Sequence, residues 1–283
     1  MSIIESAFLK TLKNSKKNID IENKIRSQNQ ATTELNAQKT PKPVSVKHTA
    51  DKQTISSRKD ISSMSQLRRY SRNELMERRL IHVGSVDDTL VNEYRNLRTK
   101  LISGQSKQNF STLVTSVVPD YDISLVVSNL ATAFSLDASK TSVVVNADIG
   151  NTKLDQLFGI SSKLGIIDYI ESEELQIDKI LYETPIARLR FVPSGDIRED
   201  SFEYFTTARM KNLVADLVAR YPERYLFVNA PSIESSADAR ILLDSCDCVV
   251  LVVPYGQCNE KDIMNAMLTV GSKKFAGLIL DDF

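Results

Sequence analysis

The feature that most constrains the fold of this chain is a series of six short apolar runs between residues 112 and 280. The runs are nearly continuous rather than alternating with polar residues, which is typical of strands buried on both faces of a parallel sheet. The sequence therefore predicts an α/β fold, a doubly wound and mostly parallel sheet with helices on both faces. The predicted strands are 112–118, 142–147, 188–193, 225–229, 248–253 and 276–280.

Helical spacing of apolar residues fills the intervals between these runs. Two further helical segments, 64–83 and 89–102, precede the first strand and form a helical lead-in, 64–103, to a domain that spans 64–283. The helices expected between the strands are 124–138, 152–158, 164–182 in pieces, 202–220, 236–246 and 260–272.

The first part of the chain has a different composition. Ile4, Phe8 and Leu12 form one apolar stripe, which predicts an amphipathic helix over 1–13. Residues 14–63 are polar and too poor in large apolar residues to offset the entropy of ordering, so we expect a disordered basic linker. Residues 1–82 carry 17 Lys and Arg against 8 Asp and Glu, although the whole chain has a net charge of zero. This basic arm is compatible with a weak contact to a membrane surface, with a partner, or with a plain solvated linker.

Several classes of protein are disfavoured by the same sequence. Cys246, Cys248 and Cys258 do not have zinc-ligand spacing, and we expect no metal site. No run approaches the roughly 20 apolar residues of a membrane span. The basic arm has Tyr70 but almost no other aromatic residue for stacking on bases, so no nucleic-acid partner is expected.

Residues 111–131 have the layout of a phosphate-binding loop: a buried strand, a tight loop and the start of a helix near Ile123. The residues that normally hold phosphate are missing. No glycine occurs between Gly104 and Gly150, and no lysine between Lys107 and Lys140. Asp120 and Asp122 stand in the loop instead, where carboxylates repel phosphate.

The order and spacing of the motifs in residues 66–281 resemble the bacterial tyrosine kinases of exopolysaccharide and capsule export, a branch of the deviant-Walker P-loop ATPases. The likeness is greatest to their exosortase-associated branch. It is carried by NEYRNLRTKL, TSVVPDYDIS, VVVNADIGNTKLDQLFG, GIIDYI, RFVPSGD, YLFVNAPS, SADARIL, CDCVVLVVPYG and GLILD. The resemblance implies a cytoplasmic protein that works with a chain-length determinant, which is a polysaccharide copolymerase of the membrane.

The resemblance also assigns a vestigial nucleotide site. In its phosphate loop, Pro119 and Asp120 precede Asp122 at the glycine position and Ile123 at the position of the phosphate-binding lysine; only Ser124, at the Mg²⁺-ligand position, matches. A side chain at the glycine position obstructs the approach of phosphate, and isoleucine cannot neutralise its charge. Asp122 is also placed to cap the following helix in place of phosphate.

The other motifs of the site depart from the family pattern in the same direction. In the second acidic motif Asp148 remains, but its first carboxylate is replaced by Asn146. In the third motif Asn229 replaces the aspartate, and a neutral amide is a weak ligand for Mg²⁺. Asp281 occupies the adenine-side asparagine position. The sequence therefore predicts a degenerate member of the family with no catalytic residues and no cofactor.

A helix that forms rings in relatives has the pattern E-x-x-R-x-x-R, and here it reads Asn92, Arg95 and Arg98. The resemblance thus implies a contact between copies of the chain, in which both arginines are kept and the glutamate is replaced by Asn92.

The leading hypothesis is a catalytically inactive regulator or adaptor at the inner face of the cell membrane. Its partner would be the chain-length determinant or an active kinase relative. The alternatives are a divergent, autophosphorylating tyrosine kinase or ATPase that uses Mg-ATP and takes its lysine from elsewhere, and a positioning protein like the cell-division ATPases.

Overall fold

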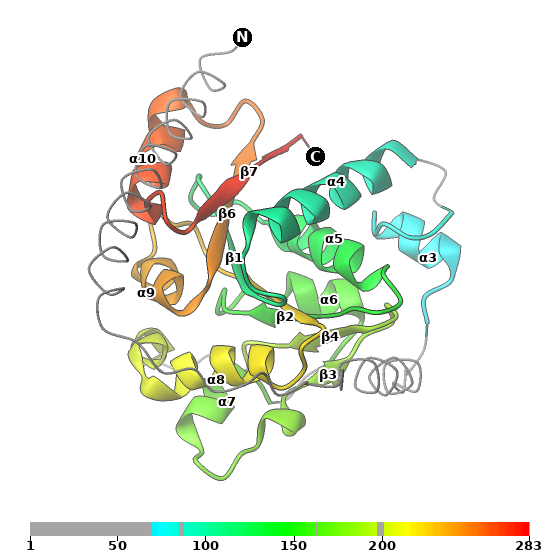
Figure 1. The fold of residues 1–283 in the computed structure, drawn as a ribbon. Coiled ribbons are helices and arrows are strands. Elements are labelled where there is room, and N and C mark those ends of the chain that lie inside the picture. The colour runs from blue at the N-terminus through cyan, green and yellow to red at the C-terminus, as the bar shows by residue number, and fades with distance from the viewer. Residues whose placement is uncertain (1–68, 85–87, 162–163, 197–200, 283) are drawn as a thin grey trace, which may run out of the picture. The chain divides into compact units, whose positions relative to one another are not determined.

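The computed structural model describes residues 69–84, 88–161, 164–196 and 201–282 (Figure 1). The predicted helix 1–13 and linker 14–63 lie outside these residues. Seven strands form one sheet in the order β3-β4-β2-β5-β1-β6-β7. The strands are β1 (Ser111–Ser116), β2 (Thr141–Asn146), β3 (Tyr182–Glu183), β4 (Leu189–Val192), β5 (Arg224–Asn229), β6 (Cys248–Pro254) and β7 (Phe275–Asp281).

All six predicted strands are present, and the pairs among them are parallel. Strand β3 was not predicted. It pairs antiparallel with β4 through Tyr182 and Glu183, and both residues are only partly buried, so no apolar run announces it. The fold is therefore the predicted doubly wound, mostly parallel α/β arrangement, with one short antiparallel strand at an edge.

Helices cover both faces of the sheet (Figure 1). On one face α4, α5 and α6 contribute to an apolar cluster that contains Val91, Val127 and Leu154. On the other face α7, α8, α9 and α10 contribute to a second cluster. The helices are α3 (Arg72–Glu77), α4 (Asp88–Gly104), α5 (Ser124–Ser135), α6 (Lys153–Phe158), α7 (Ile166–Glu171), α8 (Ala208–Ala219), α9 (Ala237–Ser245) and α10 (Glu260–Val270), with the 3-10 helices η1 (Ile177–Lys179) and η2 (Ser201–Thr206).

Helix α5 is the most deeply buried of these helices, with 11 of its 12 residues buried. Its Phe134 lies in an aromatic cluster, with ring centroids 4.7 Å from Tyr225, 5.0 Å from Phe227 and 6.2 Å from Phe110. This packing joins α5 to β5 and to the start of β1. The helix that follows the central loop is thus held rigidly against the sheet.

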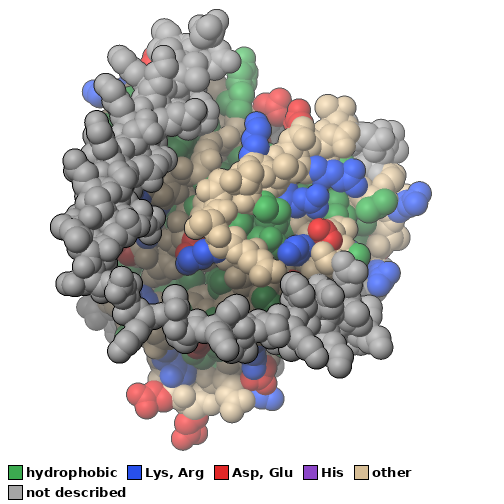
Figure 2. Space-filling model, viewed as in Figure 1, with side chains coloured by type: hydrophobic (Ala, Val, Ile, Leu, Met, Phe, Trp, Pro, Cys, Tyr) green, Lys and Arg blue, Asp and Glu red, His purple; other side chains and the backbone are tan. Residues whose placement is uncertain are grey.

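In the part of the chain that the structure describes, no helix has the length and apolar character that a membrane crossing requires. Figure 2 shows Lys and Arg side chains among uncharged and apolar ones on the face that carries α3 and α4.

Candidate functional site

The predicted strand, loop and helix are all present. Strand β1 ends at Ser116, the loop covers residues 117–123, and α5 begins at Ser124. Asp120 has a φ of 57°, in the left-handed region that Asp tolerates better than most residues. The loop thus reverses direction without a glycine, and it lies at the carboxyl edge of the sheet, where such folds bind ligands.

Ile123, at the position where relatives have the phosphate-binding lysine, faces the interior. Its side chain is 3% exposed and belongs to the apolar cluster under α4 and α5. It is the residue before the first turn of α5, and its side chain makes no hydrogen bond to the helix. The side chain at this position therefore contributes apolar packing and offers no polar group to an anion.

Asp122 occupies the space in front of α5. Its Oδ1 accepts a hydrogen bond from the backbone N of Ser124 at 3.1 Å, and its Oδ2 lies 3.2 Å from Nζ of Lys153. Burial alone would raise the pKa of Asp122, but the hydrogen bonds from Ser124 and Lys153 outweigh it and hold the pKa below its usual value. The predicted capping contact is confirmed, and a carboxylate takes the hydrogen bond that a phosphate would otherwise take.

Asn146 and Asn229 lie side by side at the ends of β2 and β5. Nδ2 of Asn229 donates to Oδ1 of Asn146 at 3.0 Å, and Nδ2 of Asn146 donates to the carbonyl of Asn151 at 2.8 Å. Both amide side chains are buried, with exposures of 0% and 1%. Two carboxylates this close would repel each other without a cation between them, whereas two amides bond directly. Oδ1 of Asn229 is the exception, because it is buried and accepts no hydrogen bond from the described residues.

Asp148, the one carboxylate kept in the second motif, accepts a hydrogen bond from Nδ2 of Asn151 at 2.9 Å. Its pKa is raised, first by burial and then by the neighbouring Asp122 and Asp120. The structure thus brings three carboxyl groups of the predicted site close enough to influence one another.

Asp281 and the loop are joined by a contact that the sequence did not reveal. The hydroxyl of Tyr121 donates to Oδ2 of Asp281 at 2.8 Å, across 160 residues of chain. Burial and this hydrogen bond raise the pKa of Tyr121 to about 12, and the pKa of Tyr94 is raised by burial and by the same carboxylate. The loop residue Tyr121 therefore contacts Asp281, the residue that the family resemblance assigns to the adenine side. Nothing in the sequence pattern marks it, because the contact depends on how β7 lies beside the loop.

A cleft of about 390 Å³ opens beside the loop, between α3, α5 and α6. Two cationic side chains, Arg78 and Lys153, line it together with Asp122 and Ser124. Lys153 is paired with Asp122, and Arg78 lies over the Tyr70 ring at 4.5 Å. Among the described residues, no group of three or more His, Cys, Asp or Glu side chains is arranged to hold a metal ion. The residues present do not fit a magnesium–nucleotide complex, because the lysine position faces the core and a carboxylate lies where phosphate would bind.

The three predicted oligomer residues lie on α4, and they differ in exposure. Asn92 and Arg95 are exposed, whereas Arg98 is half-buried and its NH1 donates to the carbonyl of Ala133 at 2.9 Å. Arg98 therefore ties α4 to α5 within the chain. The oligomer contact stays a prediction.

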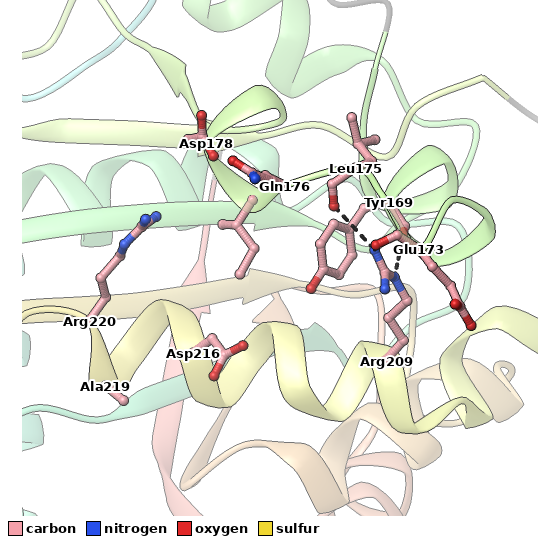
Figure 3. A pocket seen from close by; sticks show the side chains of 10 residues that line it. Tyr169, Glu173, Leu175, Gln176, Asp178, Arg209, Asp216, Ala219 and Arg220 are labelled. Carbon is pink, nitrogen blue, oxygen red and sulfur yellow. Dashed lines mark hydrogen bonds between the residues drawn. The ribbon is translucent and has the colours of Figure 1, made fainter.

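A separate cavity, of about 570 Å³, lies between the α7–η1 segment and α8 (Figure 3). Arg209 reaches from α8 toward this segment and donates to the carbonyls of Tyr169 and Leu175 at 2.5 and 3.2 Å. Its guanidinium also lies 4.2 Å from the centre of the Tyr169 ring. These bonds use Arg209 to hold the segment in place. The other charged residues that line the cavity are Glu173, Asp178, Asp216 and Arg220.

Removing the carboxylate of Asp122 is expected to cost about 1 kcal/mol of stability at pH 7, the usual value of a side chain that bonds to a helix N-terminus. Because the folded-state pKa of Asp122 is depressed, this stabilisation is present above pH about 4 and is lost as the pH falls through the folded pKa. Urea unfolding of wild type and Asp122→Ala at pH 7 and near pH 3 measures it. Lys153→Met, which removes a more exposed partner, is the matched control and should cost less. An equal deficit at both pH values would contradict the assignment.

The fold and its strand–loop–helix unit define this chain as a P-loop NTPase-like α/β protein. No protein-family model matches it. The tyrosine-protein kinase YwqD of Bacillus subtilis is 24% identical over 216 residues, which cover 75% of this chain and 90% of YwqD. The tyrosine-protein kinase CpsD of Streptococcus agalactiae is 26% identical over 192 residues, which cover 67% of this chain and 82% of CpsD.

Solved structures agree on the fold. The kinase domain of the Escherichia coli tyrosine kinase ETK has a TM-score of 0.64 at 20% identity and covers 78% of this chain and 85% of that domain. The chimerical protein CapA2B2 has a TM-score of 0.63 at 19% identity and covers 79% of this chain and 97% of the chimera. The chain is thus similar in sequence to bacterial tyrosine-protein kinases and similar in fold to a solved tyrosine kinase domain.

Proposed function

We propose that this chain is a catalytically inactive relative of those tyrosine kinases, a regulator or adaptor of a membrane-anchored chain-length determinant. The proposal rests on the contacts that two side chains of the loop make. Ile123 is buried at the lysine position, and Asp122 takes the first backbone N–H of α5 and the ammonium of Lys153. A carboxylate about 4 Å from a phosphate is repulsive by roughly 1–4 kcal/mol at effective dielectric constants of 80 to 20.

The rest of the site supports the same proposal. Within the Asn146–Asn229 pair, the amide of Asn229 donates to that of Asn146. Neither amide carries the negative charge that favours a magnesium ion. The protein in this proposal needs no cofactor. It acts from the cytoplasm at the inner face of the membrane, and it reaches that place through the chain-length determinant or through an active kinase relative. We infer this partner from the similarity to those kinases, and not from a surface of the described residues.

Titration with a fluorescent ATP analogue and Mg²⁺ tests the proposal. The full-length chain is expected to bind with a Kd above about 1 mM, which corresponds to less than about 4 kcal/mol. YwqD serves as the positive control in the same assay. A Kd in the micromolar range for this chain would overturn the proposal.

The revertant Tyr121→Glu, Asp122→Gly, Ile123→Lys restores the residues that relatives have in the loop. It is expected to bind the analogue at least tenfold more tightly than the wild type, which is about 1.4 kcal/mol. Circular dichroism establishes that the revertant is folded. Equally weak binding by a folded revertant would place the cause outside the loop.

A second candidate, an active but divergent kinase, is favoured by the place of Lys153. Its ammonium lies within 3.2 Å of a loop carboxylate, so a lysine does reach the loop from another element, α6. Under that reading, incubation with Mg-ATP produces phosphotyrosine, and Lys153→Met abolishes it. No phosphotyrosine in the wild type, under conditions in which YwqD labels itself, favours the inactive protein.

A further inference from the structure

Strand β7 is the edge of the sheet beyond β6. Within the described residues it pairs with β6 alone, whereas the opposite edge is closed by the two-residue strand β3. The pairing with β6 is irregular near Phe275 and regular from Gly277 to Asp281. A long edge strand presents a row of unpaired backbone groups, which natural proteins protect or use for association.

The register identifies which backbone groups of β7 point outward. The backbone N of Tyr255 donates to the carbonyl of Asp281 at 2.7 Å, so Asp281 faces β6. Successive residues of a parallel strand alternate between its two neighbours. Leu278 and Leu280 therefore direct their N–H and C=O groups away from β6, where a further strand would pair with them.

Side chains around this edge leave room for such a strand. A groove of about 310 Å³ separates β7 from α4 and is lined by Leu90, Tyr94 and Leu97 of the helix and by Ile279 of the strand. On the other face of the sheet Leu280 is 64% exposed. Residues 276–280 carry no charge and no proline, which are the features that usually protect an isolated edge from pairing.

Charge is distributed along the edge with opposite signs at its two ends. Glu93 and Tyr94 line the same groove as Asp281 and Asp282, so the first half of α4 lies beside the end of β7. Lys100 lies seven residues later on α4, about 10 Å along the helix. Lys273 immediately precedes β7, so it lies at the end of the strand opposite to Asp282. One end is thus acidic and the other basic.

We propose that β7 is a dimerisation edge, where two copies of this chain pair β7 with β7 antiparallel and continue the sheet across both. A two-fold axis places the same surface on both subunits, so the surface must complement itself. Antiparallel pairing sets the acidic end of each edge, with Glu93 and Asp282, against the basic end of the other, with Lys100 and Lys273. The surface differs from the Asn92 and Arg95 contact that the family relationship implies. It stands independently of whether the chain binds nucleotide.

Sedimentation equilibrium of the full-length chain between about 1 and 100 μM tests the proposal, a range that detects dissociation constants near these concentrations. The wild type is expected to form a dimer. Leu280→Pro removes an outward N–H and should leave a monomer, whereas Leu280→Ala keeps that N–H and should remain dimeric. A monomeric wild type at 100 μM would overturn the proposal. If that monomer bound a foreign peptide at β7, the edge would serve a different partner.

A charge variant tests the same surface in case the proline variant does not fold. Glu93→Lys with Asp282→Lys changes two exposed side chains and makes both ends of the edge basic. It should weaken the dimer at least tenfold, while thermal unfolding and circular dichroism stay close to wild type. Arg95→Ala, on the same helix but outside the groove, should leave the dimer unchanged. If Arg95→Ala dissociated the dimer and the Glu93→Lys, Asp282→Lys variant remained dimeric, the dimer would form through another surface.

Discussion

Ile123→Lys is expected to lower the free energy of unfolding by about 2–4 kcal/mol, because it removes a buried apolar side chain and places an ammonium group in its space. Ile123 is 3% exposed and packs in the cluster under α4 and α5. A lysine there is stable only if its ammonium reaches the water above the loop. Urea unfolding of the two proteins at pH 7 gives the difference.

The pH dependence of this variant separates a buried ammonium from lost packing. Burial depresses the pKa of a lysine below its usual value of about 10.4, so the deficit should shrink as the pH rises toward 10. Ile123→Met keeps the volume and should cost less than about 1.5 kcal/mol, with no pH dependence. If Ile123→Lys were as stable as wild type, the side chain at this position would be free to face the loop, and the main argument against nucleotide binding would fall.

Phe134→Ala is expected to destabilise the chain by about 3–5 kcal/mol, the usual cost of truncating a buried aromatic residue. The Phe134 side chain has no exposed surface, and its ring contacts those of Tyr225, Phe227 and Phe110. The neighbouring rings belong to β5 and to the start of β1, where the backbone is fixed by sheet pairing, so the cavity cannot collapse easily.

Chemical unfolding of Phe134→Ala measures this cost directly. Phe134→Leu fills part of the space and should lose less. Leu268→Ala on α10 is the exposed control, because Leu268 is 75% exposed and its loss should change stability by no more than about 0.5 kcal/mol. A loss below about 1 kcal/mol for Phe134→Ala would show that α5 is not anchored by its aromatic cluster.

Most strands were predictable because β1, β2, β5 and β6 are buried along their whole length and β4 along most of it, so that each contains a run of apolar residues. Strand β7 was predictable from its apolar run, although only Ile279 and Asp281 in it are buried. Strand β3 escaped prediction since two half-exposed residues leave no pattern. Several helices are shorter than their apolar spacing suggested, whereas α4 (Asp88–Gly104) extends beyond the predicted 89–102 at both ends. Helix α5, for example, ends at Ser135 and not at the predicted residue 138. Helix α6 ends at Phe158 as predicted, followed by Gly159 with a φ of 63°.

The positions of the site were predictable, but their contacts were not. Motif order located Asn229 and Asp281, which end β5 and β7, and Asp122, which lies in the loop after β1. The partners of these residues come from elsewhere: Lys153 reaches Asp122 from α6, and Tyr121 reaches Asp281 across the end of β7. Such pairs depend on the packing of elements that are distant in sequence, which residue spacing does not encode.

The bond between Tyr121 and Asp281 has a consequence for signalling. The loop is held at Asp122 by α5 and Lys153, and at Tyr121 by the last strand, so the chain itself supplies the bonds that order it. A switch protein changes shape because its loop depends on a γ-phosphate that is later lost. If the chain binds no nucleotide, as we propose, a partner docking above the loop would meet the same surface whatever the ratio of ATP to ADP in the cell. Its signal would report how much of this protein is present, and not the energy state of the cell.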